Sequence, residues 1–255
     1  MSVFMRLAVT VVAIFLSIPA ALAQDEKGPW SGKVLLGYLA TSGNTDNTSA
    51  NLEAALNWDG KRWHHELSGR AIGQSQDNDT TAETYKATYE AKWDFTERNY
   101  LFALLDYNKN RFTSYKQQIF EFAGVGRRFI TTEKHELNAE IAAGATQADL
   151  QELIEPPPPA DSFWVPRGSS DEFNWRASGK YHWKIGENAR FTQTLSVNSG
   201  SSNTFTESVT ELGANIYGSL AMVLSYKIQN NSDVQPGTEK TDTFAAISLE
   251  YAFGK

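Results

Sequence analysis

The chain has 255 residues, no cysteine and a net charge of −7. The lack of cysteine excludes a disulfide framework and a lipid-attached cysteine anchor. The acidic balance argues against nucleic acid as a partner.

The first residues have the pattern of an export signal. One positive charge within residues 1–6 precedes a 12-residue apolar run, Leu7 to Ile18, and the small residues of Ala21-Leu22-Ala23 follow. The run is too short for a membrane anchor, which needs roughly 20 residues. We expect residues 1–23 to be a cleaved signal peptide and residues 24–255 to form one exported domain.

A two-residue alternation of apolar and polar side chains dominates the rest of the chain. In 84–95 one face is apolar and the other charged: Tyr85, Ala87, Tyr89, Ala91, Trp93 and Phe95 oppose Thr84, Lys86, Thr88, Glu90, Lys92 and Asp94. The same alternation recurs in residues 48–58, 173–183 and 243–253. It predicts strands with lipid on one side and water on the other, as in a transmembrane β-barrel.

We expect an all-β, closed, antiparallel, up-and-down transmembrane barrel of about 12 strands. The predicted strands are 30–41, 47–58, 62–73, 82–95, 100–109, 116–130, 135–145, 171–184, 189–198, 204–217, 220–229 and 242–253. Segments 116–130 and 204–217 carry apolar residues on both faces, so we expect bulges there.

The connections between these strands alternate in length. Short turns such as Asp59-Gly60 separate longer polar links at 42–46, 74–81, 110–115, 146–170, 199–203 and 230–241. Outer-membrane barrels place short turns on the periplasmic side and longer loops outside. The longest link, 146–170, contains Pro156 to Pro159 and is expected to be extracellular, as a lid, a contact surface or a spacer.

Aromatic residues gather beside the short turns. Trp and Tyr prefer the membrane–water interface, so we predict a periplasmic aromatic girdle of Trp58, Trp63, Trp93, Trp183 and Tyr217. A soluble lipocalin-like barrel is the competing interpretation. Its core would have to pack a face on which Ala and Gly alternate with large rings, which would leave voids.

The opening of the barrel region resembles a known family. Trp30-Ser31-Gly32-Lys33, then Gly37 and Thr41 to Asp46, is similar to the start of the salt-induced outer membrane protein family of Gram-negative bacteria. The resemblance implies an outer-membrane location, a barrel and a role under osmotic stress, with outer-membrane lipid and the barrel-assembly machinery as partners. One departure is that Phe253 is followed by two further residues.

No pattern points to catalysis, and we expect a protein that is not an enzyme and has no metal or cofactor. All four histidines, His64, His65, His135 and His182, lie near short turns. Barrel hydrolases carry their active groups at the outer rim, so a hydrolase is the least favoured alternative.

The face predicted to line the lumen carries both signs of charge. Its candidate residues are Glu53, Glu66, Arg70, Lys86, Glu90, Lys92, Arg176 and Lys180. A two-residue Asp59-Gly60 turn would set Glu53 opposite Glu66, as a cation-binding constriction or as a pair neutralised by Arg70, Lys33 or Lys92.

Two functions stay open from the sequence. One is a porin-like channel for ions or small polar solutes, or an envelope protein of osmotic stress. The other is a closed-lumen structural or binding barrel that uses its extracellular loops.

Overall fold

The computed structural model describes residues 28–41, 47–76, 79–110, 115–154, 163–234 and 239–254. The predicted signal peptide, residues 1–23, lies outside these ranges. No helix in the described part of the chain is long and apolar enough to cross a membrane, and this finding leaves open a crossing by strands.

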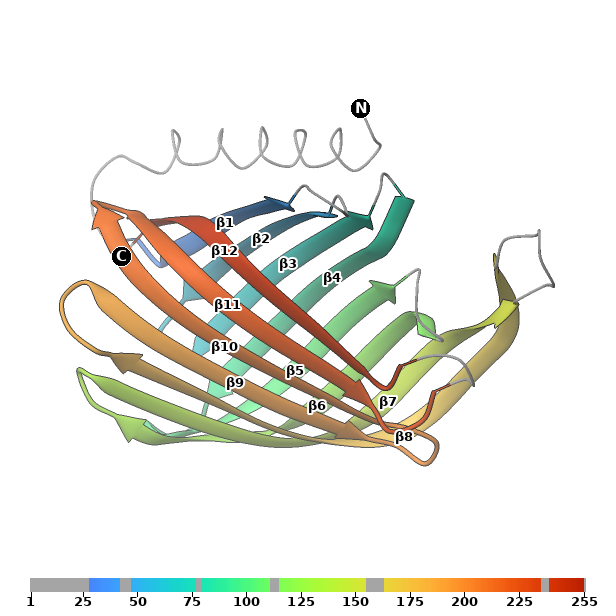
Figure 1. Cartoon of the computed structure of the whole chain (residues 1–255). Coiled ribbons are helices and arrows are strands. Elements are labelled where there is room, and N and C mark those ends of the chain that lie inside the picture. The colour runs from blue at the N-terminus through green and yellow to red at the C-terminus, as the bar shows by residue number, and fades with distance from the viewer. Residues whose placement is uncertain are drawn as a thin grey trace.

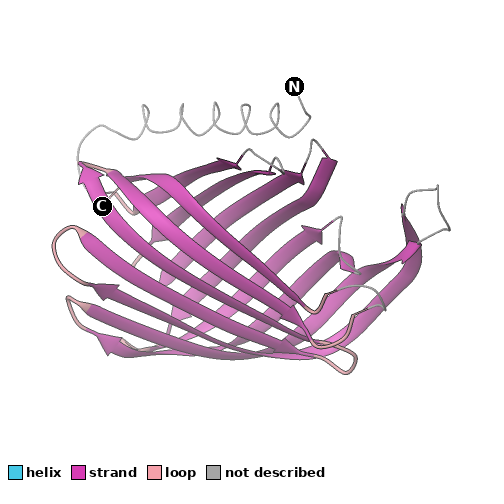
Figure 2. Cartoon of the chain, in the orientation of Figure 1, coloured by secondary structure: helices cyan, strands magenta, loops and turns pink. Residues whose placement is uncertain are grey.

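The described residues form twelve antiparallel strands that close into a barrel (Figures 1 and 2). Each strand pairs with its sequence neighbours, and β1 pairs with β12 to close the ring. The strands are β1 Trp30–Thr41, β2 Asn47–Asp59, β3 Trp63–Gln76, β4 Asp79–Asp94, β5 Asn99–Asn110, β6 Tyr115–Thr131, β7 His135–Ile154, β8 Phe163–Lys184, β9 Ala189–Ser199, β10 Thr204–Tyr217, β11 Leu220–Asn231 and β12 Thr241–Phe253. The predicted fold class is confirmed.

The two ends of the barrel differ in their connections. One end, here the short-turn rim, has the links 60–62, 95–98, 132–134, 185–188 and 218–219, and β12 ends there. The last of these turns contains Gly218 with φ of 54°, a conformation that glycine adopts at no steric cost. The opposite end, the long-connection rim, has the links 42–46, 77–78, 111–114, 155–162, 200–203 and 232–240.

The expected loop 146–170 is wrong in its extent. Residues 146–154 continue β7 and residues 163–170 belong to β8, and this hairpin projects past the rest of the rim (Figure 1). A two-stranded ribbon that extends past the neighbouring strands is open to solvent on both faces, so its composition resembles that of a loop. The prolines 156–159 lie outside the described residues.

Side chains alternate between the two faces of the wall. Large apolar residues such as Leu36, Ile141 and Leu249 point outward and are exposed, whereas Glu207, Lys227 and other charged residues are buried inside. A soluble barrel would show the opposite arrangement. The outer surface therefore has the composition of a lipid-facing band.

The five predicted girdle aromatics lie where their strands meet the short-turn rim. A second set of exposed aromatic residues lies nearer the other rim and was not predicted from the sequence: Tyr38, Phe173, Trp175 and Tyr226. Trp175 and Trp183 are eight residues apart on β8, or roughly 26 Å along the strand. Strands tilted by about 40° would set the two levels roughly 20 Å apart in height, close to the thickness of the apolar band of outer-membrane barrels.

Part of the lumen is filled by an apolar cluster that the sequence analysis did not predict. Tyr100, Phe102 and Leu104 of β5 point inward with Phe120, Phe122, Ala142 and Phe205. Three rings lie opposite glycines of the next strand, in the pairs Tyr100–Gly126, Phe102–Gly124 and Phe122–Gly144. These glycines leave room for the rings, since a Cβ at Gly126 would lie 2.3 Å from the Tyr100 ring.

Candidate functional site

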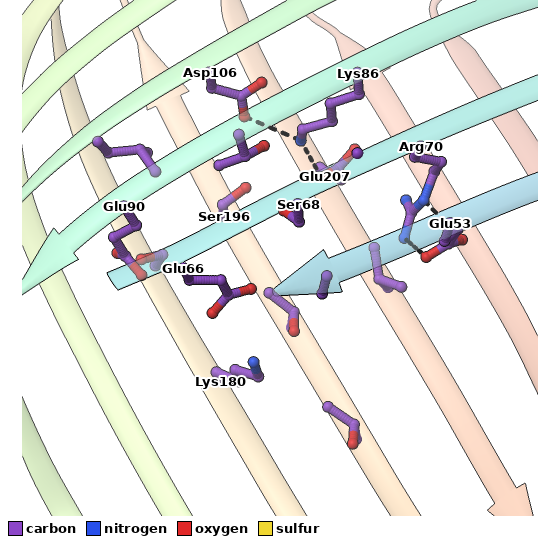
Figure 3. Close-up of a pocket in the computed structure, with 18 of the residues that line it drawn as sticks. Glu53, Glu66, Ser68, Arg70, Lys86, Glu90, Asp106, Lys180, Ser196 and Glu207 are labelled. Carbon is purple, nitrogen blue, oxygen red and sulfur yellow. Dashed lines mark hydrogen bonds and ion pairs between the residues drawn. The ribbon is translucent and has the colours of Figure 1, made fainter. Parts of the chain in front are cut away.

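A cavity of about 290 Å³ occupies the middle of the barrel. All eight lumen candidates line it, and Figure 3 shows several of them pointing into the shared space. Further lining residues add charge of both signs, among them Lys33, Asp106, Glu140, Glu207 and Glu211. Such a lining accommodates water and small charged solutes rather than apolar ones.

The register places Glu53 opposite Arg70, so the expected Glu53–Glu66 pair is wrong. The turn is longer than assumed: residues 60–62 form it, and the amide of Gly60 donates to the carbonyl of Trp63. The turn is also centred two residues later in the chain, so every partner in β3 moves by four positions. Arg70 binds Glu53 through two nitrogens at 2.8 and 3.0 Å, which is the neutralised alternative that the sequence left open.

Two facing carboxylates do occur in the cavity, between different residues. Glu66 of β3 is the register partner of Glu90 of β4. Lys92 neutralises Glu90 at 2.8 Å and also reaches Glu140 at 3.1 Å. Among the described residues Glu66 has no ion pair or hydrogen bond, so its carboxylate remains available to a solute.

A partly buried ion pair spans the lumen. Lys86 of β4 contacts Glu207 of β10 at 2.9 Å and Asp106 of β5 at 3.1 Å (Figure 3). In the twelve-strand ring β4 and β10 are six strands apart, on opposite walls. Glu207 also accepts a hydrogen bond of 2.7 Å from Gln229. We call the Lys86–Glu207 contact the cross-lumen bridge, and it closes the central cavity on one side.

An aromatic contact narrows the lumen further toward the long-connection rim. Phe120 of β6 stacks on Phe205 of β10 with ring centroids 6.0 Å apart. Spaces of about 30 Å³ and about 20 Å³ lie in this half of the barrel, the first beside Phe120 and the second beside Lys227. Each has room for about one or two water molecules.

The other end of the cavity meets a wider vestibule of about 330 Å³ at the short-turn rim. The two spaces share part of their lining, namely Glu66, Glu90, Lys92, Asn138 and Lys180. In the vestibule wall His64 lies between Asp59 and Asp94, with 3.0 Å from a ring nitrogen to each carboxylate. The interior is thus open from the short-turn rim to the cross-lumen bridge, with charged side chains beside the apolar cluster.

A family model described as "Protein of unknown function, DUF481" matches residues 34–253. The chain belongs to this family. Its description names no activity, so the salt-related role that the sequence resemblance implies is a proposal and not a family property.

A related protein, "Uncharacterized protein YdiY" of Escherichia coli strain K12, is 27% identical over 227 residues, which cover 89% of this chain and 84% of the relative. Its description, like that of the DUF481 family, states no function. The relationship therefore extends over most of the barrel without assigning a role to it.

Solved structures that align with most of this chain include one outer membrane channel and two porins. An outer membrane channel from Pseudomonas putida F1 aligns with a TM-score of 0.49 and 10% identity, over 90% of this chain and 97% of that one. The NanC porin aligns with a TM-score of 0.47 and 10% identity, over 87% of this chain and 97% of that one. The KdgM porin aligns with a TM-score of 0.44 and 7% identity, over 88% of this chain and 99% of that one. These scores and identities support no transfer of function.

Proposed function

We propose that this protein is an outer-membrane barrel that forms a narrow passage for ions or small polar solutes. The location is supported by the exposed apolar outer surface and by the aromatic residues at two levels of it. Residues 1–23, which we propose as a cleaved signal peptide, would direct export, and the barrel-assembly machinery would insert the chain.

The central cavity is the observation that carries the passage proposal. It is about 290 Å³ in volume, it is lined by side chains of both signs, and it shares its lining with the vestibule at the short-turn rim. A barrel that served only as a scaffold would gain stability from a filled interior. Charged side chains around an open space can keep their hydration, and a pathway for polar solutes needs such a lining.

The cross-lumen bridge makes the proposed passage a narrow one. Beyond the Lys86–Glu207 contact the spaces are near the size of single water molecules, so we expect a small conductance or a passage that opens when this contact breaks. Large solutes of the kind that pass general porins would be excluded.

Recordings in planar lipid bilayers test the proposal. We expect small current steps from the wild-type protein and larger steps from the Lys86→Ala/Glu207→Ala variant, in which both halves of the bridge are removed. The matched control is Lys180→Ala, which changes a lining lysine that has no ion pair among the described residues. Inserted protein that gives no steps in any of the three would refute a passage.

The second candidate is a closed-lumen structural or binding barrel. It is favoured by one observation, the pair of contacts that cross the lumen, Lys86–Glu207 and Phe120–Phe205. In that case the projecting β7–β8 hairpin would be its contact surface. Silence of the wild type and of the bridge variant in the same recordings would support this function.

A role under osmotic stress is a further part of the proposal and rests on the sequence resemblance. It is tested by deleting the gene and comparing growth at low and high salt. A deletion strain that grows like its parent strain at both salt concentrations would exclude this role and leave the passage proposal unaffected.

A further inference from the structure

Two histidines face outward at the short-turn rim, and the first lies in a stack of aromatic rings. In β3 the ring of His65 lies between Trp63 and Tyr89, with centroids 6.0 and 6.1 Å away and planes inclined by 6° and 14°. Trp58 of β2 adds a tilted contact at 5.5 Å. We call Trp63, His65 and Tyr89 the β3 cluster.

The second histidine repeats this arrangement on the other side of the ring. His135 of β7 lies between Trp183 and Tyr181 of β8, with centroids 5.8 and 6.1 Å away and planes inclined by 20° and 11°. We call these three residues the β7 cluster. The same three residue types therefore meet in the same stacked geometry at two places, although different strands supply them.

One hydrogen bond orients each imidazole. Nδ1 of His65 lies 2.9 Å from the hydroxyl of Tyr89, and Nδ1 of His135 lies 2.8 Å from the hydroxyl of Tyr181. When the hydroxyl donates to Nδ1, the ring hydrogen lies on Nε2. Nε2 of neither histidine has a partner among the described residues. Each cluster thus holds one oriented donor ready for an acceptor from outside the protein.

Basic side chains lie beside both clusters. Lys61 and Arg62 are in the turn that precedes Trp63, and Lys134 is in the turn that precedes His135. All three are exposed and have no salt bridge within the described residues. The second turn also contains the acidic Glu133, so the β3 cluster has the stronger positive charge.

We propose that each cluster binds the phosphate group of a glycerophospholipid at the membrane interface. The Trp and Tyr rings would pack against the glycerol and upper acyl chains. The imidazole Nε2 and the neighbouring cations would bind the phosphate through charge-assisted hydrogen bonds. This inference rests on the membrane location in the proposed function, and it is independent of whether the lumen conducts.

Native mass spectrometry of the protein purified from membranes in detergent tests the proposal, with dioleoyl phosphatidylglycerol as the added lipid. We expect two tightly bound lipids on the wild type. His65→Gln and His135→Gln should each weaken one of them at least fivefold, and the double variant should weaken both.

The chain supplies its own matched controls in His64 and His182, which lie on the opposite face of their strands. His64 is 3.0 Å from Asp59 and Asp94, and His182 is 3.1 Å from Thr192. His64→Gln and His182→Gln should bind lipid like the wild type. Dioleoylglycerol, which lacks the phosphate, should bind weakly, and millimolar inorganic phosphate should displace little lipid.

Three results would overturn the inference: wild-type affinity in the His65→Gln/His135→Gln variant, equal binding of dioleoylglycerol, or displacement of the lipid by inorganic phosphate. Insertion into liposomes of the same phosphatidylglycerol separates this failure from failure of the proposed location. Protein that inserts but shows no histidine-dependent binding overturns the lipid sites alone, whereas protein that does not insert overturns both.

Discussion

The cross-lumen bridge gives the most direct test of how the interior is held together. Glu207 is buried and Lys86 is partly buried, with side chains 11% and 20% exposed, and their charged atoms are 2.9 Å apart. With an effective dielectric constant of about 20, their attraction at this distance is about 6 kcal/mol. Loss of hydration offsets much of that attraction, but removal of Lys86 leaves Glu207 and Asp106 without the cation that both contact.

We therefore expect Lys86→Met to lower the free energy of unfolding by about 3 to 5 kcal/mol. Glu207→Gln should lower it by less, because Lys86 keeps its contact with Asp106 at 3.1 Å. The double variant should lose less than the sum of the two, with a coupling energy of about 2 kcal/mol. Urea-induced unfolding in lipid vesicles, followed by tryptophan fluorescence, measures all three values.

Lys180→Met is the control for this cycle. Lys180 lines the same cavity without an ion pair among the described residues, so its replacement should cost less than about 1 kcal/mol. A coupling energy below about 0.5 kcal/mol between positions 86 and 207 would show that the two walls are not linked through this contact. The narrow-passage model would then lose its closing element.

Three other substitutions test separate features of the lumen. Glu66→Gln removes a carboxylate that has no ion pair among the described residues, so it should lower the preference of the channel for cations over anions. It should change the free energy of unfolding by less than about 1 kcal/mol. An unchanged preference would contradict a role of Glu66 in selectivity. Gly126→Ala would place a Cβ 2.3 Å from the Tyr100 ring, so it should lower the free energy of unfolding by about 1 to 3 kcal/mol in the same urea assay. The control is Gly69→Ala, where the nearest atom to the added Cβ is 3.8 Å away. It should lower the free energy of unfolding by less than about 1 kcal/mol. Phe205→Ala removes an aromatic contact across the lumen and should destabilise the barrel by about 3 kcal/mol. It should also enlarge the current steps in the bilayer recordings. Steps of wild-type size would show that this ring does not restrict passage.

Much of the wall could be predicted from the sequence because a strand carries its two faces at fixed alternating positions. The apolar face of 84–95 is the outward face of β4, and the short turns end the strands within a few residues of the predicted places. The mixed faces of 116–130 predicted irregular pairing, and β6 does shift register between Tyr115 and Gln117 and between Arg128 and Ile130.

The contacts inside the barrel could not be predicted in this way. The turn lies at 60–62 and not at 59–60, and this moved the partner of Glu53 by four positions, from Glu66 to Arg70. Period-two reasoning gives the face of a side chain but not the residue opposite to it, because the register depends on turn length. The ring pairs with Gly124 and Gly126 likewise follow from the register of β5 and β6.

Local alternation and turn chemistry predict an antiparallel barrel of about twelve strands with an apolar outside, a charged inside and aromatic residues at one rim. Which charges neutralise one another, and where the lumen narrows, depends on contacts between strands that are distant in the chain. Lys86 and Glu207 are 121 positions apart in the chain, and they meet only because closure of the ring brings β4 and β10 to face each other across the interior.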